Sequence, residues 1–164
     1  MRKYDKMRNK NLRKGRSTVF KRKIYSKMQE WKKDSNGKTA LLIEGARRIG
    51  KSTVVEEFAK NEYDSYILID FSRASKETKE LFEDVSDLNF LFLQLQLQFK
   101  VDLQERESVI IFDEVQLCPA ARQAIKALVA DRRYDYIETG SLISINKNIK
   151  NILIPSEERK ISMY

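Results

Sequence analysis

Short apolar runs alternate along this chain with longer segments in which apolar residues recur at helical spacing. The runs have the length of buried strands and cover residues 39–44, 66–70, 109–113, 136–139 and 160–164. Helical segments follow the first and third runs, and Pro119 opens the second of them. Their predicted inner faces are Val54, Val55, Phe58 and Ala59 in one and Ala121, Ala124, Ile125, Leu128 and Val129 in the other. Strands that alternate with helices predict an α/β fold with a parallel sheet.

Residues 91–99 (LFLQLQLQF) fit this scheme less directly. Their apolar and polar residues alternate with a period near two, which taken alone predicts a strand. We nevertheless expect helix throughout residues 76–99, because a crossover between two parallel strands is needed in this region.

The chain opens with two segments of different character. Residues 1–17 lack periodicity and predict a flexible basic arm. An amphipathic helix packed on the core is predicted for residues 18–34, where apolar residues recur at helical spacing: Phe20, Ile24, Met28 and Trp31. Turn residues at 34–37 end this helix, and residues 35–164 are expected to form the core domain.

Positive charge is concentrated in these opening segments. Residues 1–34 hold 14 Lys or Arg and three acidic residues, whereas the remaining 130 residues hold 18 basic and 21 acidic ones. The arm therefore has the charge to contact nucleic acid or anionic lipid, and a solvated tail explains the same charge. The sequence leaves this choice open.

Composition excludes several classes of protein. With 164 residues, 41% of them hydrophobic and 34% charged, the chain is typical of one soluble domain with a full core. No apolar run reaches the roughly 18 to 20 residues of a membrane span, and no secretory signal is recognisable. The single cysteine, Cys118, fits a cytoplasmic location, and the lack of histidine excludes His-based catalysis.

The most specific motif is Gly45-Ala46-Arg47-Arg48-Ile49-Gly50-Lys51-Ser52-Thr53. It matches the P-loop pattern Gly-x4-Gly-Lys-Ser, and it lies between a predicted strand and a predicted helix as that pattern requires. The glycines allow backbone amides to turn inward around an anion at a helix N-terminus. Lys51 is expected to reach the β- and γ-phosphates, and the Ser52 hydroxyl to ligate Mg²⁺.

A second group of candidate residues ends the run Val109-Ile110-Ile111-Phe112-Asp113-Glu114. Four apolar residues place this strand in the sheet centre, so Asp113 emerges at the carboxyl edge, where ligands of open α/β sheets bind. Asp113 is expected to hold Mg²⁺ as the Walker B acid does, and Glu114 to orient the attacking water. The room for a further strand between Ser52 and Asp113 indicates the P-loop branch with a strand between the two motifs.

Polar residues close the fourth predicted strand. We predict that Ser141 senses the γ-phosphate, with Thr139 as the alternative and a plain strand-to-loop cap as the simpler interpretation. Arg47 and Arg48, inside the P-loop, face phosphate, a partner subunit or solvent, and the sequence does not decide among these. The segment 146–149 (NKNI) lacks the acid that guanine recognition needs.

These motifs make the chain similar to a group of bacterial and archaeal AAA-type ATPases whose larger members add a C-terminal domain of unknown function. The resemblance rests on residues 40–52, 110–116, 136–142 and 154–160 with the strand that follows, and it extends from about Val19 to Tyr164. It implies ATP as the nucleotide, hydrolysis as the reaction, and a P-loop three-layer sandwich with a parallel sheet of order 5-1-4-3-2.

The resemblance also makes Arg159 a candidate catalytic arginine, because family members carry one just before the fifth strand. It would act on its own site or on a neighbouring subunit of a homo-oligomer, and a surface ion pair with Glu157 or Glu158 is the alternative. Because the sequence stops at Tyr164, we expect a core without the C-terminal lid.

Three functions remain open at this stage. The leading one is an ATPase that drives a partner or an attached domain. The second is a nucleotide-gated binding module with little or no hydrolysis, and DNA is its candidate ligand. A small-molecule kinase would need an acceptor site and an arginine-bearing lid, and no lid segment is evident after the fourth strand.

Overall fold

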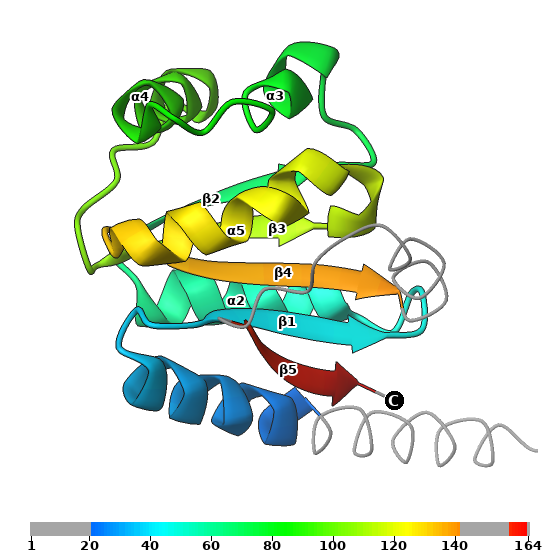
Figure 1. The fold of residues 1–164 in the computed structure, drawn as a ribbon. Coiled ribbons are helices and arrows are strands. Elements are labelled where there is room, and N and C mark those ends of the chain that lie inside the picture. The colour runs from blue at the N-terminus through cyan, green and yellow to red at the C-terminus, as the bar shows by residue number, and fades with distance from the viewer. Residues whose placement is uncertain (1–20, 142–157, 164) are drawn as a thin grey trace, which may run out of the picture.

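The computed structural model describes residues 21–141 and 158–163, and five parallel strands form one sheet within them. The strands are β1 (Ala40–Gly45), β2 (Ser65–Asp70), β3 (Ser108–Asp113), β4 (Asp135–Ser141) and β5 (Glu158–Met163). Their spatial order is β2-β3-β4-β1-β5, which confirms the predicted order 5-1-4-3-2 (Figure 1).

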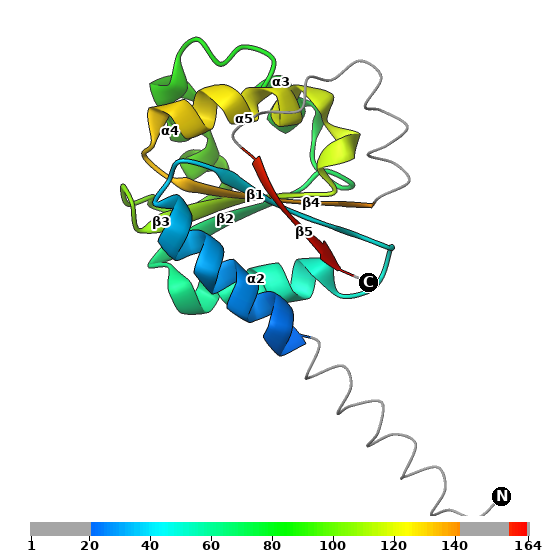
Figure 2. The same ribbon diagram turned by 60° about the horizontal axis from the view of Figure 1, so that its bottom comes forward.

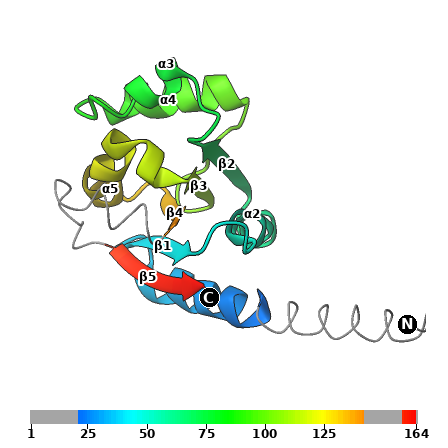
Figure 3. The ribbon, with the colours of Figure 1, turned by 90° about the vertical axis from the view of Figure 1, so that its right-hand side faces the viewer.

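Helices cover both faces of this sheet. They are a leading helix over residues 21–35, α2 (Lys51–Glu62), α3 (Lys76–Glu80), α4 (Leu88–Phe99), the 3-10 turn η1 (Val115–Leu117) and α5 (Pro119–Asp131). The leading helix and α2 lie on one face, and α5 lies on the other with α3 and α4 (Figures 2 and 3). The fold is therefore the three-layer α/β sandwich that the sequence predicts.

Two apolar cores follow from the alternation of side chains along each strand. On the α2 side, Leu41 and Ile43 pack with Met28 and Trp31 of the leading helix. On the α5 side, Ile110 and Phe112 of β3 belong to the other core. All predicted inner-face residues of α2 and α5 are buried, whereas Phe20 lies outside the described residues.

The expected continuous helix over residues 76–99 is wrong, although its last part is helical. α3 ends at Glu80, and a second helix starts at Leu88 after Asp87, whose carboxylate accepts a capping hydrogen bond from the Phe90 amide at 3.0 Å. The alternating pattern of α4 arises because its apolar residues lie on two sides of the helix. Leu91, Phe92 and Leu95 are buried, while Phe90, Leu93 and Leu97 are more than half exposed.

Two element boundaries also differ from the prediction. The leading helix continues through residue 35 and ends where Asn36 and Gly37 take positive φ angles of 43° and 77°. β5 begins at Glu158, two residues earlier than predicted, so Arg159 lies inside the strand. Within the described residues, no helix is long and apolar enough to cross a membrane.

A buried ion cluster joins α5, β4 and β5. Arg122 donates to Glu138 at 3.1 Å and to Glu158 at 2.8 Å, and all three side chains are at most 3% exposed. Burial raises the pKa of Glu138 well above its ordinary value of 4.5, with Arg122 opposing the rise and Glu158 adding to it. The folded protein therefore holds this proton more tightly than the unfolded chain does.

This pKa shift predicts that Glu138 favours folding most below pH 4.5, its ordinary pKa, and that this contribution is lost as pH rises through the raised pKa. Glu138→Gln has a similar shape and cannot ionise, so its free energy of unfolding should fall less between pH 4.5 and neutral pH than that of the parent. Urea denaturation across this pH range measures both proteins. Parallel pH profiles of parent and variant would contradict the assignment.

The same cluster offers a second variant with a matched control. Arg122→Met leaves two carboxyl groups buried without their cation and should cost about 3 to 5 kcal/mol. Lys126→Met, at an exposed position of the same helix, should change stability by about 0.5 kcal/mol or less.

Candidate functional site

The segment between β1 and α2 closes as a tight loop at the carboxyl edge of the sheet. Gly45 ends β1, and Gly50, with φ of 90°, precedes the first residue of α2. A Cβ atom on Gly45 would lie 2.1 Å from the main-chain oxygen of Met163 in β5 and 2.7 Å from Cδ1 of Ile49. The first position must therefore be glycine for close approach and the second for its backbone angle.

Lys51 occupies the inside of this loop. Its ammonium donates to the carbonyl oxygens of Gly45 at 3.2 Å and Ala46 at 2.7 Å, and the residue is only 4% exposed. Burial lowers the pKa of Lys51, while Glu114 and Asp113 oppose the change. A cation held by two neutral carbonyl groups at a helix N-terminus is well placed to attract an anion.

Ser52 and Asp113 face each other across the gap between α2 and β3. The Ser52 hydroxyl lies 2.7 Å from Oδ1 and 2.9 Å from Oδ2 of Asp113, so the structure brings the two predicted metal ligands together. Thr139 of β4 donates to Oδ1 of the same carboxylate and accepts from the Glu114 amide at 3.1 Å. Three elements thus meet at one carboxylate.

Glu114 follows β3 in a left-handed conformation, with φ of 54° and ψ of 48°. Its carboxylate accepts a hydrogen bond from Nε2 of Gln116, two residues further along the chain in η1. The predicted water-orienting acid is therefore beside Asp113 in sequence, with its backbone held by Thr139 and its side chain by Gln116.

The remaining loop residues surround this centre. Ser141 ends β4 opposite Gly45 in the strand register and is buried. Ala46, Arg47, Arg48 and Thr53 are exposed, and Ile49 is half-buried. Arg47 lies near enough to Lys51 to lower its pKa by charge repulsion. The side chains of Arg47 and Arg48 are thus accessible to solvent and to any ligand or partner at this edge.

Arg159 is the one predicted site residue that the structure places away from the loop. It pairs with Leu41 in the register, whereas Met163 pairs with Gly45, so Arg159 lies four residues, or about 13 Å, towards the other end of the strands. Its guanidinium donates to Asp34 at 3.4 Å, and both side chains are largely exposed. Of the two predicted ion-pair partners, Glu157 lies outside the described residues, and Glu158 is paired with Arg122 instead. Among the described residues, the ion pair of Arg159 is with Asp34.

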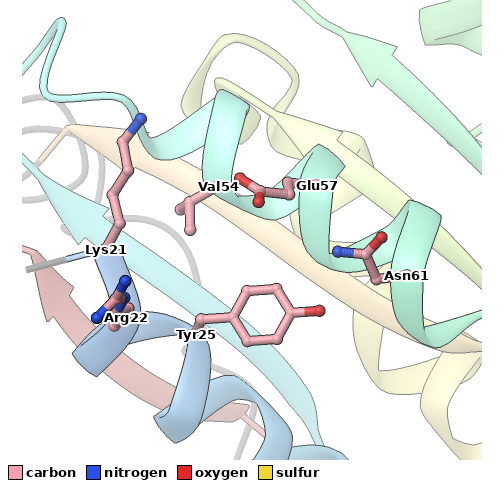
Figure 4. Close-up of a pocket in the computed structure, with 6 residues that line it drawn as sticks. All are labelled: Lys21, Arg22, Tyr25, Val54, Glu57 and Asn61. Carbon is pink, nitrogen blue, oxygen red and sulfur yellow. The ribbon is translucent and has the colours of Figure 1, made fainter. Parts of the chain in front are cut away.

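A cavity of about 550 Å³ lies between the leading helix and α2 (Figure 4). Its lining consists of Lys21, Arg22, Tyr25, Val54, Glu57 and Asn61. Lys21 extends from the leading helix towards the loop, and its Cε lies 4.0 Å from the position of a Cβ on Gly50. The cavity therefore continues from the P-loop end of α2, and its volume is typical of a small-ligand site.

The donor atoms present suit Mg²⁺ bound together with a nucleotide. Such Mg²⁺ takes one or two protein oxygens, while phosphates and water complete its octahedron. The facing Ser52 hydroxyl and Asp113 carboxylate supply such oxygens. Over residues 21–141 and 158–163, no group of three or more Cys, Asp or Glu forms a cage for a metal ion, and a nucleotide-bound Mg²⁺ needs none.

Sequence reasoning missed several residues of this site. Gln116 follows the acidic pair by two positions, and only its place in a tight turn brings it back to Glu114. Lys21 and Tyr25 lie beside the buried stripe of the leading helix, where their sequence pattern resembles any solvated helix face. Thr139 was expected only as an alternative γ-phosphate sensor, although its position opposite Asp113 follows once the register of β3 and β4 is known.

Comparison with known proteins agrees with this fold. The sequence model of a family described as an AAA domain matches residues 37–163, from the end of the leading helix to the end of β5. A search of curated proteins finds no match to the chain.

The close approach at Gly45 predicts a strong effect of a single methyl group. In Gly45→Ala the new Cβ would meet main chain, which cannot rotate away, so β5 or the loop must shift. We expect a loss of about 1 to 3 kcal/mol in the free energy of unfolding, as for overpacked sites. Gly50→Ala is the comparison, because its Cβ meets nothing nearer than 4.0 Å and its cost comes from the positive φ angle alone.

Chemical denaturation of the two variants checks this prediction. Equal stability of Gly45→Ala and the parent would show that the β1–β5 contact is not tight in solution.

Proposed function

We propose that this chain, which belongs to the AAA domain family, binds ATP with Mg²⁺ and hydrolyses it. The observation that carries the proposal is the meeting of Ser52 and Asp113 at 2.7 Å beside the buried Lys51. A hydroxyl, a carboxylate and a cation brought together from two motifs 61 residues apart are the groups that a Mg²⁺–triphosphate complex needs.

Each residue has a distinct role in this proposal. Lys51 exchanges its carbonyl partners for phosphate oxygens, and Ser52 and Asp113 hold Mg²⁺, which neutralises phosphate charge when bound. Glu114 orients the attacking water, and Ser141 lies beside the first loop residue, where it can sense the terminal phosphate. Gln116 restrains the Glu114 carboxylate until that water is present.

The cavity beside Lys21 is the proposed place of the nucleoside. One end of its lining, Val54, lies in the same turn of α2 as Lys51 and Ser52, and Lys21 contributes to both the cavity lining and the loop surroundings. Tyr25 offers an aromatic ring, and Glu57 and Asn61 offer hydrogen-bonding groups for a base. We expect adenine rather than guanine, because the sequence lacks the Asn-Lys-x-Asp motif.

A nucleotide-gated binding module is the second candidate, and the charge of the arm favours it. Residues 1–17 hold eight Lys or Arg and one acid, enough to bind DNA phosphates in a salt-dependent way.

Arg159 remains a proposed catalytic arginine that acts on the site of a second copy of the chain, since its exposure on the edge strand β5 leaves it accessible. Mixing Arg159→Ala with Glu114→Gln protein tests this role through recovery of ATPase activity.

Glu114→Gln should bind ATP with parental affinity and hydrolyse it at least about 100-fold more slowly, because general-base assistance is lost while the metal ligands remain. Steady-state phosphate release measures turnover and calorimetry measures binding. Lys51→Ala is the binding control, with an expected loss of at least about 1.5 to 3 kcal/mol in ATP affinity.

Running the phosphate-release assay with and without DNA separates the two candidate functions. Parental turnover that Glu114→Gln abolishes supports the enzyme. ATP-dependent DNA binding without turnover supports the module, and equal ATP affinity of Lys51→Ala and the parent would refute the nucleotide site itself.

Lys21→Ala should weaken ATP binding about fivefold, which corresponds to about 1 kcal/mol for a partly exposed charge near phosphate. Lys23→Ala removes an exposed lysine from the same helix and should leave affinity unchanged. Calorimetry compares the affinity of each variant for ATP with its affinity for triphosphate alone, which separates contacts to the nucleoside from contacts to the phosphates. Identical affinities of the two variants would place the nucleoside elsewhere.

A further inference from the structure

Thr139 links the two acids of the site through one hydroxyl group. It lies in β4, one register position beyond the pair Phe112 and Glu138, so it stands directly opposite Asp113. The residue is fully buried. Its hydroxyl accepts a hydrogen bond from the Glu114 amide at 3.1 Å and donates its proton to Oδ1 of Asp113.

These two bonds fix the direction of the hydroxyl. Oδ1 of the carboxylate can only accept and the amide can only donate, so the Thr139 oxygen must receive one hydrogen and give its own to the carboxylate. Asp113 is contacted from the other side by Ser52, the other predicted metal ligand. If Ser52 ligates a metal ion, it does so through an oxygen lone pair and can still donate its proton to Asp113. Thr139 holds the same carboxylate from β4 and is a second restraint on its position.

The backbone conformation of Glu114 also depends on a hydrogen bond to Thr139. A non-glycine residue with φ of 54° is strained and persists only where its surroundings hold it. The bond from the Glu114 amide to Thr139 is such a restraint, because it forms at the residue where β3 turns into η1. The Thr139 hydroxyl therefore restrains both the carboxylate of Asp113 and the backbone of Glu114 at the end of β3.

We infer that Thr139 is a positioning residue that orients Asp113 for Mg²⁺ and fixes the backbone of Glu114. The inference rests on the proposed Mg²⁺–ATP site. It differs from a phosphate-sensing role, because Thr139 acts through the two acids, and Ser141, in register with Gly45, remains the proposed phosphate sensor.

The test uses the full chain with Thr139→Val, which keeps the shape and loses the hydroxyl, and Thr139→Ser, which keeps the hydroxyl. Without nucleotide, NMR should show the Glu114 amide exchanging at least about tenfold faster in the Val variant, as expected for a lost hydrogen bond. In Mg²⁺ titrations of ATP binding, that variant should need about 10- to 100-fold more Mg²⁺. ATP binding in the presence of a chelator should stay parental, and Ser should restore both readouts.

Each outcome decides the question. Unchanged amide exchange and an unchanged Mg²⁺ requirement in Thr139→Val would overturn the inference while leaving the nucleotide site intact. Equal weakening of ATP binding with and without Mg²⁺ would also overturn it, because it would indicate general damage to the loop. A parent protein that binds ATP without any response to Mg²⁺ would refute the proposed function, and the inference with it. If Thr139→Val does not fold, Thr139→Ala is compared with Thr139→Ser by the same measurements.

Discussion

The position of the Asp113 carboxylate is set by the parallel register of β3, β4 and β1. Ser52 and Thr139 both form hydrogen bonds to that carboxylate, so the site is built around it. Phe112 pairs with Glu138 in one direction, and Thr139 pairs with Ile43 in the other. The carboxyl ends of three strands therefore stop at the same edge, and their last side chains on the α2 side converge there. α2 starts at this point, and its first turn brings Lys51 and Ser52 to the carboxylate. Strand pairing, rather than local loop sequence, thus assembles residues from three distant segments.

The side chains of Lys51 and Ser52 already have hydrogen-bond partners within the protein, and this affects the energy of ligand binding. Lys51 already has two carbonyl partners, and the Ser52 hydroxyl already has a carboxylate. An anion bound by Lys51 must therefore compete with these two carbonyl groups, and it has the advantage of a charge opposite to that of the ammonium. Burial also lowers the pKa of Lys51 by disfavouring its charged form, and a bound anion would oppose this effect. These constraints favour a highly charged ligand such as a triphosphate over a neutral one.

The periodicity of apolar residues was sufficient to predict those helices and strands that are buried on one side or completely. The strands and the inner faces of α2 and α5 belong to this class, and so does the P-loop, whose pattern is local. It failed where the outcome depended on contacts distant in sequence. In residues 76–99 the break between α3 and α4 rests on a cap at Asp87, which pattern alone does not distinguish from an ordinary helical acid. Arg159 was expected near the loop from the family resemblance, whereas the start of a strand parallel to β1 lies at the opposite edge of the sheet, about 13 Å from the residue that pairs with Gly45.

The ion cluster on the other face of the sheet bears on the site through the same strand register. Glu138 and Thr139 are consecutive residues of β4, so their side chains point to opposite faces. Glu138 is held by Arg122 on the α5 side, and Thr139 is held by Asp113 on the α2 side. A slip of β4 by one residue would exchange the two faces, leaving a buried carboxyl group among apolar side chains and a threonine in place of the partner of Arg122. The cost of such an exchange disfavours every slip by an odd number of residues. The buried cluster of Arg122 and Glu138 therefore keeps the Thr139 hydroxyl on the face of the sheet where it contacts Asp113.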